Sequence, residues 1–191
     1  MDCASAFDNN GCNGGLPSHA FEYIKYAGGL HTEQDYPYTA NDTGGCEVLS
    51  SPRQQHEKEL VVQVAEVFNI TSRDEVDLTA AIAKIGPVSV AFQVTPDFRF
   101  YSHGVYDSFN STSNTVICQD DEQSVNHAVV AVGFGETVDA EPVPFYIIRN
   151  SWGSSWGMEG YFWMKRGQNL CGISDCASFP IVSVQNKISP I

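Results

Sequence analysis

Six cysteines in a chain of 191 residues restrict the possible folds more than any other feature of the sequence. No Cys-x-x-Cys pair and no His-x-x-x-His pair occurs, so the spacing does not suit zinc and no metal site is expected. The spacing favours disulfide bonds between loops, which form in oxidising compartments. Sequons at Asn41, Asn69 and Asn110 are candidate glycosylation sites and favour the same compartment. We therefore expect a protein of the secretory route.

The charge balance argues against two classes of partner. The chain has 10 basic and 23 acidic residues, which gives a formal net charge of −13. Nucleic acids and anionic membranes both recruit basic surfaces, so we expect no nucleic-acid partner and no membrane association. Hydrophobic residues make up 42% of the chain and aromatic residues 12%, which favours a packed core over a disordered chain.

Residues 1–59 have a mainly helical pattern. Pro17 suits the first turn of a helix, and Gly28 with Gly29 suits its end. Residues 31–59 are polar, contain several prolines and glycines, and are expected to be irregular. Within the predicted helix, apolar residues recur at helical spacing, at Ala20, Phe21, Ile24 and Ala27.

Residues 60–191 have a β-rich pattern. A short helix is expected to begin with a capping box over residues 72–75 and to end near residue 85. The spacing of the strands predicts a small antiparallel sheet or barrel, and the whole chain is therefore expected to be α+β. Strands are predicted at residues 60–64, 88–94, 127–134, 145–149 and 160–164.

One histidine stands in a position that suits catalysis. His127 begins a predicted strand, and Asn150 ends another. If these strands are neighbours, the asparagine oxygen can accept an imidazole N–H and orient the ring, and Trp152 can cover that bond from water. A histidine at a strand edge is more often structural, so the residues alone leave the role of His127 open.

A series of short motifs spans nearly the whole chain. They are Gly11-Cys12-Asn13-Gly14-Gly15, Gly86-Pro87-Val88-Ser89-Val90, Asn126-His127-Ala128-Val129, Asn150-Ser151-Trp152-Gly153, Trp156-Gly157, Glu159-Gly160-Tyr161 and Cys171-Gly172-Ile173. In order and approximate spacing, these motifs resemble those of the papain-like cysteine peptidases. Three further stretches, residues 14–18, 20–26 and 176–181, resemble the cathepsin H and aleurain branch of that family.

The resemblance implies a papain-like two-lobe fold of the α+β class. Residues 1–59 are expected to form a remnant of the helical left lobe and the crossover, and residues 60–191 a β-barrel-like right lobe with the C-terminal segment. It also implies thiol-dependent hydrolysis of peptide or protein substrates, by an endopeptidase or an aminopeptidase without a cofactor. A monomer in the lysosome or vacuole is expected.

The resemblance also assigns roles to individual residues. His127 is expected to act as the general base, Asn150 to orient it and Trp152 to shield their contact. The substrate backbone is expected to bind at Gly14 and Gly15, where no Cβ blocks its approach, although a plain tight turn explains the pair as well. The resemblance also implies a specificity pocket, although packing in the core is the commoner explanation for any single apolar residue. The expected pocket residues are Leu16, Pro17, Ala91, Ala128 and Cys176.

The cysteines receive partners from the same resemblance. The partner of Cys12 is expected in a segment that precedes residue 1. Cys176 resembles the cysteine that tethers a propeptide remnant, which partly blocks the cleft and turns an endopeptidase into an aminopeptidase. A disulfide-linked remnant at Cys176 is therefore a candidate partner. The remaining cysteines are expected to form the pairs Cys3–Cys46 and Cys118–Cys171.

One family motif does not occur in the sequence. The nucleophile of the family lies in Cys-Gly-Ser-Cys-Trp, a few residues after an oxyanion-hole Gln, and residues 1–191 contain neither. We therefore expect a fragment that is inactive alone. The alternative is an inactive, peptidase-derived binding or regulatory protein.

Residues 153–157 also fit the Gly-x-Ser-x-Gly motif of serine hydrolases. That motif needs a helix after it, but here a predicted strand rich in aromatic residues follows.

Overall fold

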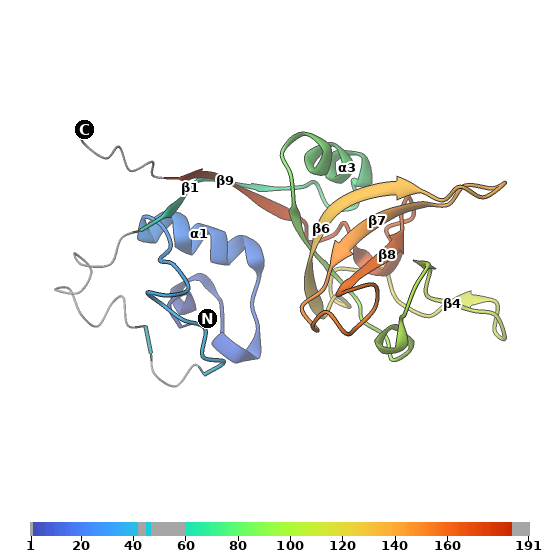
Figure 1. Cartoon of the computed structure of the whole chain (residues 1–191), viewed down its shortest axis with the longest axis horizontal. Coiled ribbons are helices and arrows are strands. Elements are labelled where there is room, and N and C mark those ends of the chain that lie inside the picture. Colours follow the sequence, from blue (N-terminus) through green and yellow to red (C-terminus); the bar gives the residue numbers. More distant parts are fainter. Residues whose placement is uncertain (1, 42–44, 47–59, 185–191) are drawn as a thin grey trace. The chain divides into compact units, whose positions relative to one another are not determined.

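The computed structural model describes residues 2–41, 45–46 and 60–184, and the chain divides into two compact units. One unit comprises residues 1–68 with 179–191, and the other comprises residues 69–178. Figure 1 shows both units in the colours of the sequence. The sequence predicted a boundary after residue 59, between the two expected lobes. The compact units are a different division of the chain and do not test that boundary, so it stays a prediction. Much of the irregular segment predicted at 31–59 lies outside the described residues.

The first unit contains helix α1 and two neighbouring strands, and the chain enters it through two 3-10 helices. The bounds are Ser5–Phe7 and Gly11–Asn13 for the 3-10 helices, Pro17–Ala27 for α1, Val62–Asn69 for β1 and Ser178–Val184 for β9. The strand β1 starts two residues later than predicted and runs longer, because it pairs with β9, a partner that the local sequence pattern does not reveal.

Proline and glycine mark the ends of α1, as the sequence predicted. Pro17 lies in the first turn, where a backbone N–H has no acceptor within the helix, so the missing N–H of proline costs no hydrogen bond. Gly28 ends the helix with φ at 84°. The predicted apolar face is only half-buried within this unit. Its residues Ala20, Ile24 and Ala27 line a cavity of about 540 Å³.

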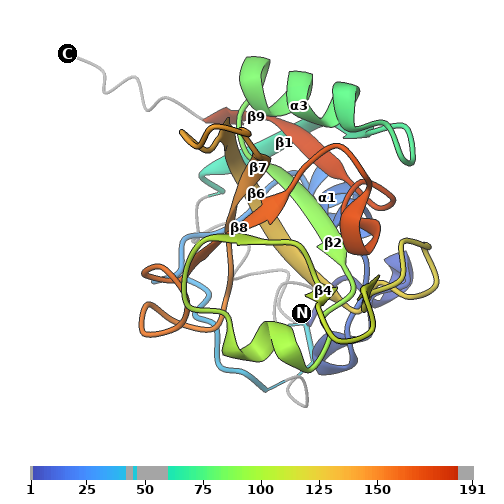
Figure 2. The same cartoon turned by 90° about the vertical axis from the view of Figure 1, so that its right-hand side faces the viewer.

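An antiparallel sheet forms the centre of the second unit, in the order β2 (Val88–Phe92), β6 (His127–Glu136), β7 (Pro144–Arg149) and β8 (Tyr161–Lys165). These strands confirm four of the predicted β-runs. Strand β3 (Val105–Tyr106) adds in parallel to β8, and helix α3 (Glu75–Lys84) packs against β2 and β6 (Figure 2). The remaining elements are the hairpin of β4 (Phe109–Asn110) and β5 (Thr115–Val116), and the 3-10 helices η3 (Asp97–Phe100) and η4 (Leu170–Gly172).

Alternate side chains of these strands form the core of the second unit. Every second residue of a strand points to the same face, so one face of the sheet is apolar and buried. The largest fully buried side chains of the unit come from the strands and from the elements that cover them: Leu78, Val88, Val90, Phe92, Phe98, Tyr146, Ile148, Phe162, Met164 and Ile173.

A bulge in β6 sets its register with β7. Ala131 pairs with Ile148, and the next pair is Gly133 with Ile147, so Val132 is an extra residue with no partner of its own. Such a residue shifts the pairing by one position and increases the local twist. The bulge therefore decides which residues of the two strands meet at the end of the ladder.

The start of α3 differs from the capping box that the sequence predicted. Asp74, and not Ser72, is the N-cap residue, because its Oδ1 accepts hydrogen bonds from the N–H groups of Val76 and Asp77 at 3.0 and 2.9 Å. Glu75 is the expected second member of the box, but its carboxylate accepts hydrogen bonds from the distant loop at residues 167–169. A tertiary contact has therefore displaced the local one.

We expect loss of this cap to destabilise the protein. Asp74→Ala leaves two N–H groups of α3 without their acceptor and should lower the free energy of unfolding by about 1 kcal/mol. Asp74→Asn keeps an acceptor at the cap and should have a small effect. Urea unfolding followed by circular dichroism measures both, and equal losses in the two variants would contradict the assignment of the cap.

Candidate active site

The pairing of β6 with β7 brings His127 and Asn150 together. The last paired residues of the two strands are Val130 and Arg149, and both chains continue beyond this pair towards the same end of the sheet. There, His127 Nε2 and Asn150 Oδ1 lie 2.9 Å apart. On the other side of β6, His127 pairs with Phe92 of β2, so the ladder also holds the histidine backbone.

The partners of Asn150 define which imidazole nitrogen carries the proton. Asn150 Oδ1 also accepts the backbone N–H of Ser151 at 2.8 Å, so this atom is an acceptor in both contacts. His127 Nε2 must therefore donate, and in the neutral ring Nδ1 keeps its lone pair. Among the described residues none donates a hydrogen bond to Nδ1. The arrangement produces an oriented imidazole whose second nitrogen can accept a proton.

Two aromatic rings lie against the imidazole. The ring of Trp152 stacks on it, with centroids 5.2 Å apart and an angle of 28° between the planes. The ring of Phe92 meets it edge-on at 5.9 Å. Asn150 is only 7% exposed, so its hydrogen bond with His127 is largely protected from water. Protection from water strengthens such a bond.

The residues expected to bind substrate fall into two groups. Ala91 and Ala128 are paired across β2 and β6, next to the pair that contains His127, and Ala128 is exposed. Cys176 is half-buried and follows η4 in the same unit. The other group, Gly14 with the rest of the 14–17 segment, belongs to the first unit.

The segment from Gly14 to Pro17 connects the second 3-10 helix to α1. Gly14 has φ at +102°, and its carbonyl accepts the N–H of Asn10 at 2.8 Å. A Cβ on Gly15 would collide with the side chain of Asn9. Both glycines are therefore needed for the turn itself, while Gly14, Gly15 and Leu16 remain exposed.

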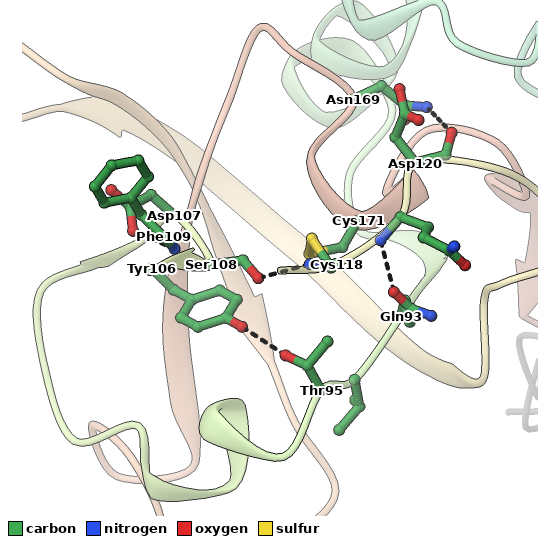
Figure 3. Close-up of a disulfide and its surroundings, with 12 residues drawn as sticks. Gln93, Thr95, Tyr106, Asp107, Ser108, Phe109, Cys118, Asp120, Asn169 and Cys171 are labelled. Atoms are coloured by element: carbon green, nitrogen blue, oxygen red, sulfur yellow. Dashed lines mark hydrogen bonds between the residues drawn. A yellow bond between two sulfur atoms is a disulfide. The ribbon is translucent and has the colours of Figure 1, made fainter. Parts of the chain in front are cut away.

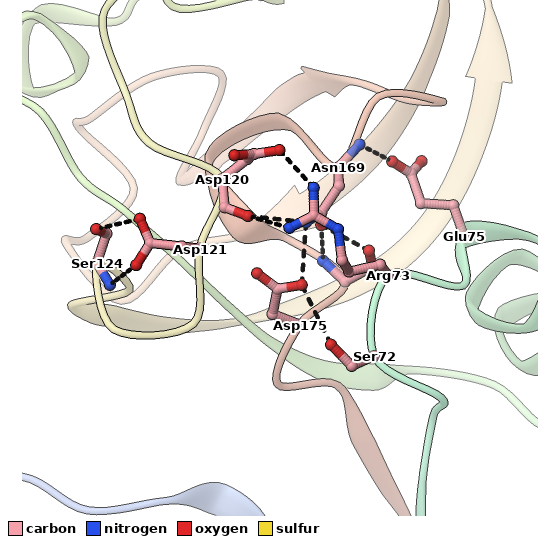
Figure 4. A network of polar contacts seen from close by, with 9 residues as sticks. Ser72, Arg73, Glu75, Asp120, Asp121, Ser124, Asn169 and Asp175 are labelled. Carbon is pink, nitrogen blue, oxygen red and sulfur yellow. Dashed lines mark hydrogen bonds and ion pairs between the residues drawn. The ribbon is translucent and has the colours of Figure 1, made fainter.

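A residue that the sequence analysis missed holds the loop before Cys176. One oxygen of the Glu75 carboxylate accepts the N–H of Gly167 at 2.6 Å. The other oxygen accepts the N–H of Asn169, as Figure 4 shows. Asn169 Nδ2 in turn donates to Asp175 Oδ1 at 3.0 Å, one residue before Cys176. No periodic pattern signals this contact, because it joins residues that are 92 positions apart.

The structure contains the two disulfides that the resemblance implied. Cys118–Cys171 ties η4 to the loop after β5 (Figure 3), and Cys3–Cys46 lies in the first unit. The Cys171 carbonyl also accepts the N–H of Gln93, directly after β2. The η4 region is therefore joined to the sheet by a covalent bond and a hydrogen bond. Neither disulfide includes Cys12 or Cys176.

The sequons lie in different settings. Asn69 ends β1, Asn110 ends β4, and both are exposed, whereas the sequon of Asn41 extends outside the described residues.

Within the described part of the chain, no helix has the length and apolarity to cross a membrane. The same residues include no cluster of three or more His, Cys, Asp or Glu side chains suited to a metal ion.

The sequence and the fold match a known family. The pattern of the family described as "Papain family cysteine protease" matches residues 1–181. The chain therefore belongs to the papain family of cysteine proteases, and it has the α+β fold of that family.

Its similar relatives include aleurain-type and cathepsin H proteins. The chain is 50% identical over 183 residues to "Thiol protease aleurain-like" of Arabidopsis thaliana, which covers 96% of this chain and 46% of the relative. It is 47% identical over 181 residues to "Pro-cathepsin H" of Bos taurus, which covers 95% of this chain and 49% of the relative. The chain thus spans about half the length of the curated relatives it matches.

Solved structures of two insect digestive proenzymes are also similar. The procathepsin L2 proteinase from the larval midgut of Tenebrio molitor matches with a TM-score of 0.77 and 34% identity, over 94% of this chain and 50% of that chain. Procathepsin L 3 from the same source matches with a TM-score of 0.75 and 32% identity, over 94% and 52% of the two chains.

The thiol of Cys176 should be less reactive than an ordinary cysteine. Burial raises its pKa, and the negative charges of Glu122 and Asp175 raise the pKa further. Because the thiolate is the reactive form, alkylation by iodoacetamide should need a higher pH than for a free thiol. Glu122→Gln removes one negative charge, so it should lower the pKa and speed alkylation at pH 8 by about twofold.

Mass spectrometry of the peptide that contains Cys176 gives the rate of this reaction. Glu141→Gln, which removes an exposed carboxylate from the loop between β6 and β7, is the matched control and should leave the rate unchanged. An equal acceleration in both variants would show that net charge, and not the local field of Glu122, governs the thiol.

Proposed function

We propose that this chain supplies the general base, and the residues that orient it, for a cysteine peptidase that cleaves peptide or protein substrates. The observation that carries the proposal is the hydrogen bond from His127 Nε2 to Asn150 Oδ1, beside the stacked ring of Trp152. This bond leaves Nδ1 as the proton acceptor, in a chain that belongs to a family of thiol enzymes.

In the proposed reaction, His127 Nδ1 takes the proton of a cysteine thiol. The resulting imidazolium lowers the pKa of the thiol, and the thiolate attacks the carbonyl carbon of the scissile bond. The imidazolium then returns the proton to the leaving amine, and water hydrolyses the thioester. Asn150 is suited to orient the ring through both steps, because its neutral oxygen accepts the Nε2 proton without adding a charge.

We assign the attacking thiol to a cysteine outside residues 1–191. Four of the six cysteines form disulfides, and none of the six stands in the Cys-Gly-Ser-Cys-Trp motif of the family. Purified residues 1–191 should therefore not hydrolyse an aminoacyl or dipeptidyl fluorogenic substrate. Turnover by this chain that is blocked by iodoacetamide would show that one of its own cysteines acts as the nucleophile.

For substrate binding, we propose the exposed backbone of Gly14 and Gly15 and a pocket that includes Ala91, Ala128 and Cys176. The exposure of Gly14, Gly15 and Ala128 supports this assignment. Leu16 and Pro17 belong to the first unit, and their part in substrate binding stays an expectation from the sequence.

The same reasoning leads to a proposal for the setting of the protein. The two disulfides and the exposed sequons Asn69 and Asn110 support passage through the secretory route to a lysosome or vacuole, as a glycosylated monomer. Cys176 lies outside the disulfides and is the proposed attachment point for a propeptide remnant. Such a remnant would favour aminopeptidase over endopeptidase activity.

The roles of His127 and Asn150 can be tested in the full-length gene product. His127→Ala removes the proton acceptor and should lower kcat/KM by about 10²–10⁴-fold. Asn150→Ala removes only the orienting group and should cause a smaller loss, seen mainly in kcat. Hydrolysis of a fluorogenic peptide measures both effects.

His103→Ala is the matched control, because His103 is exposed and the one side-chain hydrogen bond of its ring among the described residues is with the neighbouring Ser102 hydroxyl. This variant should keep full activity. Parental activity in His127→Ala would refute the assignment. An upstream reading frame with serine or glycine in place of the nucleophile would favour the alternative, an inactive binding or regulatory protein.

A further inference from the structure

We propose that Asn10 is a site of spontaneous deamidation, a modification that replaces the asparagine with a mixture of aspartate and isoaspartate. The sequence contains two Asn-Gly pairs, Asn10-Gly11 and Asn13-Gly14, and both lie in the turn that precedes α1. Asn-Gly pairs react most readily, because glycine has no Cβ that hinders attack by its backbone nitrogen. The modification itself depends on residues 1–191 alone, whereas its effect on substrate binding rests on the function proposed above.

The reaction needs no enzyme and no co-reactant other than water. The backbone nitrogen of Gly11 attacks the side-chain carbonyl carbon of Asn10 and forms a new C–N bond. The C–N bond of the side-chain amide breaks, and the amide leaves as ammonia with the proton that the Gly11 nitrogen loses. Water then opens the resulting succinimide ring at either of its carbonyl groups. Opening at one carbonyl gives aspartate, and opening at the other gives isoaspartate, in which the main chain is longer by one carbon atom.

Both asparagine side chains are able to take the position that this attack requires. Asn10 and Asn13 are exposed, and among the described residues no hydrogen bond holds either side-chain amide. Such an amide can rotate until its carbonyl carbon faces the nitrogen of the next residue. The side chain of Asn9 differs, because it lies against Gly15 and is followed by another asparagine. Exposure therefore leaves two candidates and does not decide between them.

The two sites differ in the backbone nitrogen that must attack. The N–H of Gly14 donates to the Gly11 carbonyl at 3.3 Å. The N–H of Gly11 has no acceptor within the part of the chain that the structure describes. A nitrogen whose N–H is held in a hydrogen bond must lose that bond before it can attack. The fold of the turn therefore protects Asn13 and leaves Asn10 open to the reaction.

Asn10 also stands where the turn closes. Its N–H donates to the Gly14 carbonyl at 2.8 Å, and its carbonyl accepts the N–H of Asn13 at 2.9 Å. In isoaspartate, the extra carbon atom lies between Asn10 and Gly11, inside the loop that the bond from Asn10 to Gly14 closes. The former backbone carbonyl of Asn10 becomes a free carboxylate, which adds a negative charge to an acidic chain. Isoaspartate at position 10 should therefore displace the backbone of Gly14.

This displacement concerns the surface that we propose for the substrate chain, the exposed backbone of Gly14 and Gly15. Isoaspartate at position 10 should weaken substrate binding and raise KM, with little effect on kcat, since His127 and Asn150 belong to the other unit. The Gly11 nitrogen attacks after it has lost its proton, so the reaction is faster at higher pH. An acidic compartment would preserve the asparagine, and a neutral one would convert it.

The experiment incubates folded residues 1–191 at neutral pH and follows both asparagines by mass spectrometry. Fragmentation of the reduced and alkylated peptide distinguishes the two positions, and Asn13 is the matched control because it belongs to the same dipeptide in the same turn. Asn10 should deamidate about three- to tenfold faster than Asn13, since one hydrogen bond contributes that much to an equilibrium. In urea, which unfolds the turn, this difference should disappear. Asn10→Gln should abolish the fast reaction, because glutamine must close a larger ring.

Circular dichroism checks the fold, and the full-length gene product serves for the same measurement if residues 1–191 do not fold. Equal rates at the two positions in a folded chain would overturn the proposal. A preference for Asn10 that persists unchanged in urea would also overturn it, because the neighbouring residues and not the turn would then decide the rate.

The effect on substrate binding is measured in the full-length gene product with a fluorogenic peptide. Incubation at neutral pH should raise the KM of the parent protein and leave that of Asn10→Gln constant. An unchanged KM in a protein that carries isoaspartate at position 10 would refute the effect on binding. An inactive gene product in which Asn10 deamidates faster than Asn13 would refute the proposed peptidase and leave the modification site standing.

Discussion

The antiparallel register between β6 and β7 is the constraint on which the site depends. The ladder ends at Val130 and Arg149, and the same register continued three places further would set residue 152 opposite His127. The asparagine that accepts the imidazole N–H and the tryptophan that stacks on the ring are both brought into place by this one alignment. Two strands thus supply the base and its immediate environment, although the residues are far apart in the sequence.

The rest of the second unit keeps that end of the sheet in place. Phe92 of β2 holds the other side of His127, and Phe98 of η3 packs against the rings of Phe92 and Trp152. On a different part of the unit, the carboxylate of Glu75 and the disulfide of Cys171 hold the loop that leads to Cys176. The unit therefore combines two independent supports, an aromatic one for the imidazole and a polar and covalent one for the thiol of Cys176.

Local sequence signals predicted α1, α3 and the strands β1, β2, β6, β7 and β8. Pro17 and Gly28 mark the ends of α1, and runs of β-favouring residues indicated the strands. That His127 and Asn150 meet depended on which strands are neighbours, and only the family resemblance implied it. The signals failed where a distant contact outweighs the local one. Glu75 resembles part of a helix cap, but its carboxylate accepts hydrogen bonds from main-chain N–H groups 92 and 94 residues away. Phe98 lies in a four-residue element with no periodicity, and only the fold shows which rings it contacts.

The extra residue in β6 has a consequence for how such chains tolerate insertions and deletions. Val132 offsets the two halves of the hairpin by one position, and the offset lies between the site and the connecting loop at residues 137–143. Changes of length in that loop need not disturb His127, because they occur beyond the hydrogen-bonded ladder. Removal of one residue between 127 and 133 would instead turn the imidazole to the opposite side of the sheet. Insertions at the tip of the β6–β7 hairpin should therefore be tolerated, whereas changes of length at its base should not.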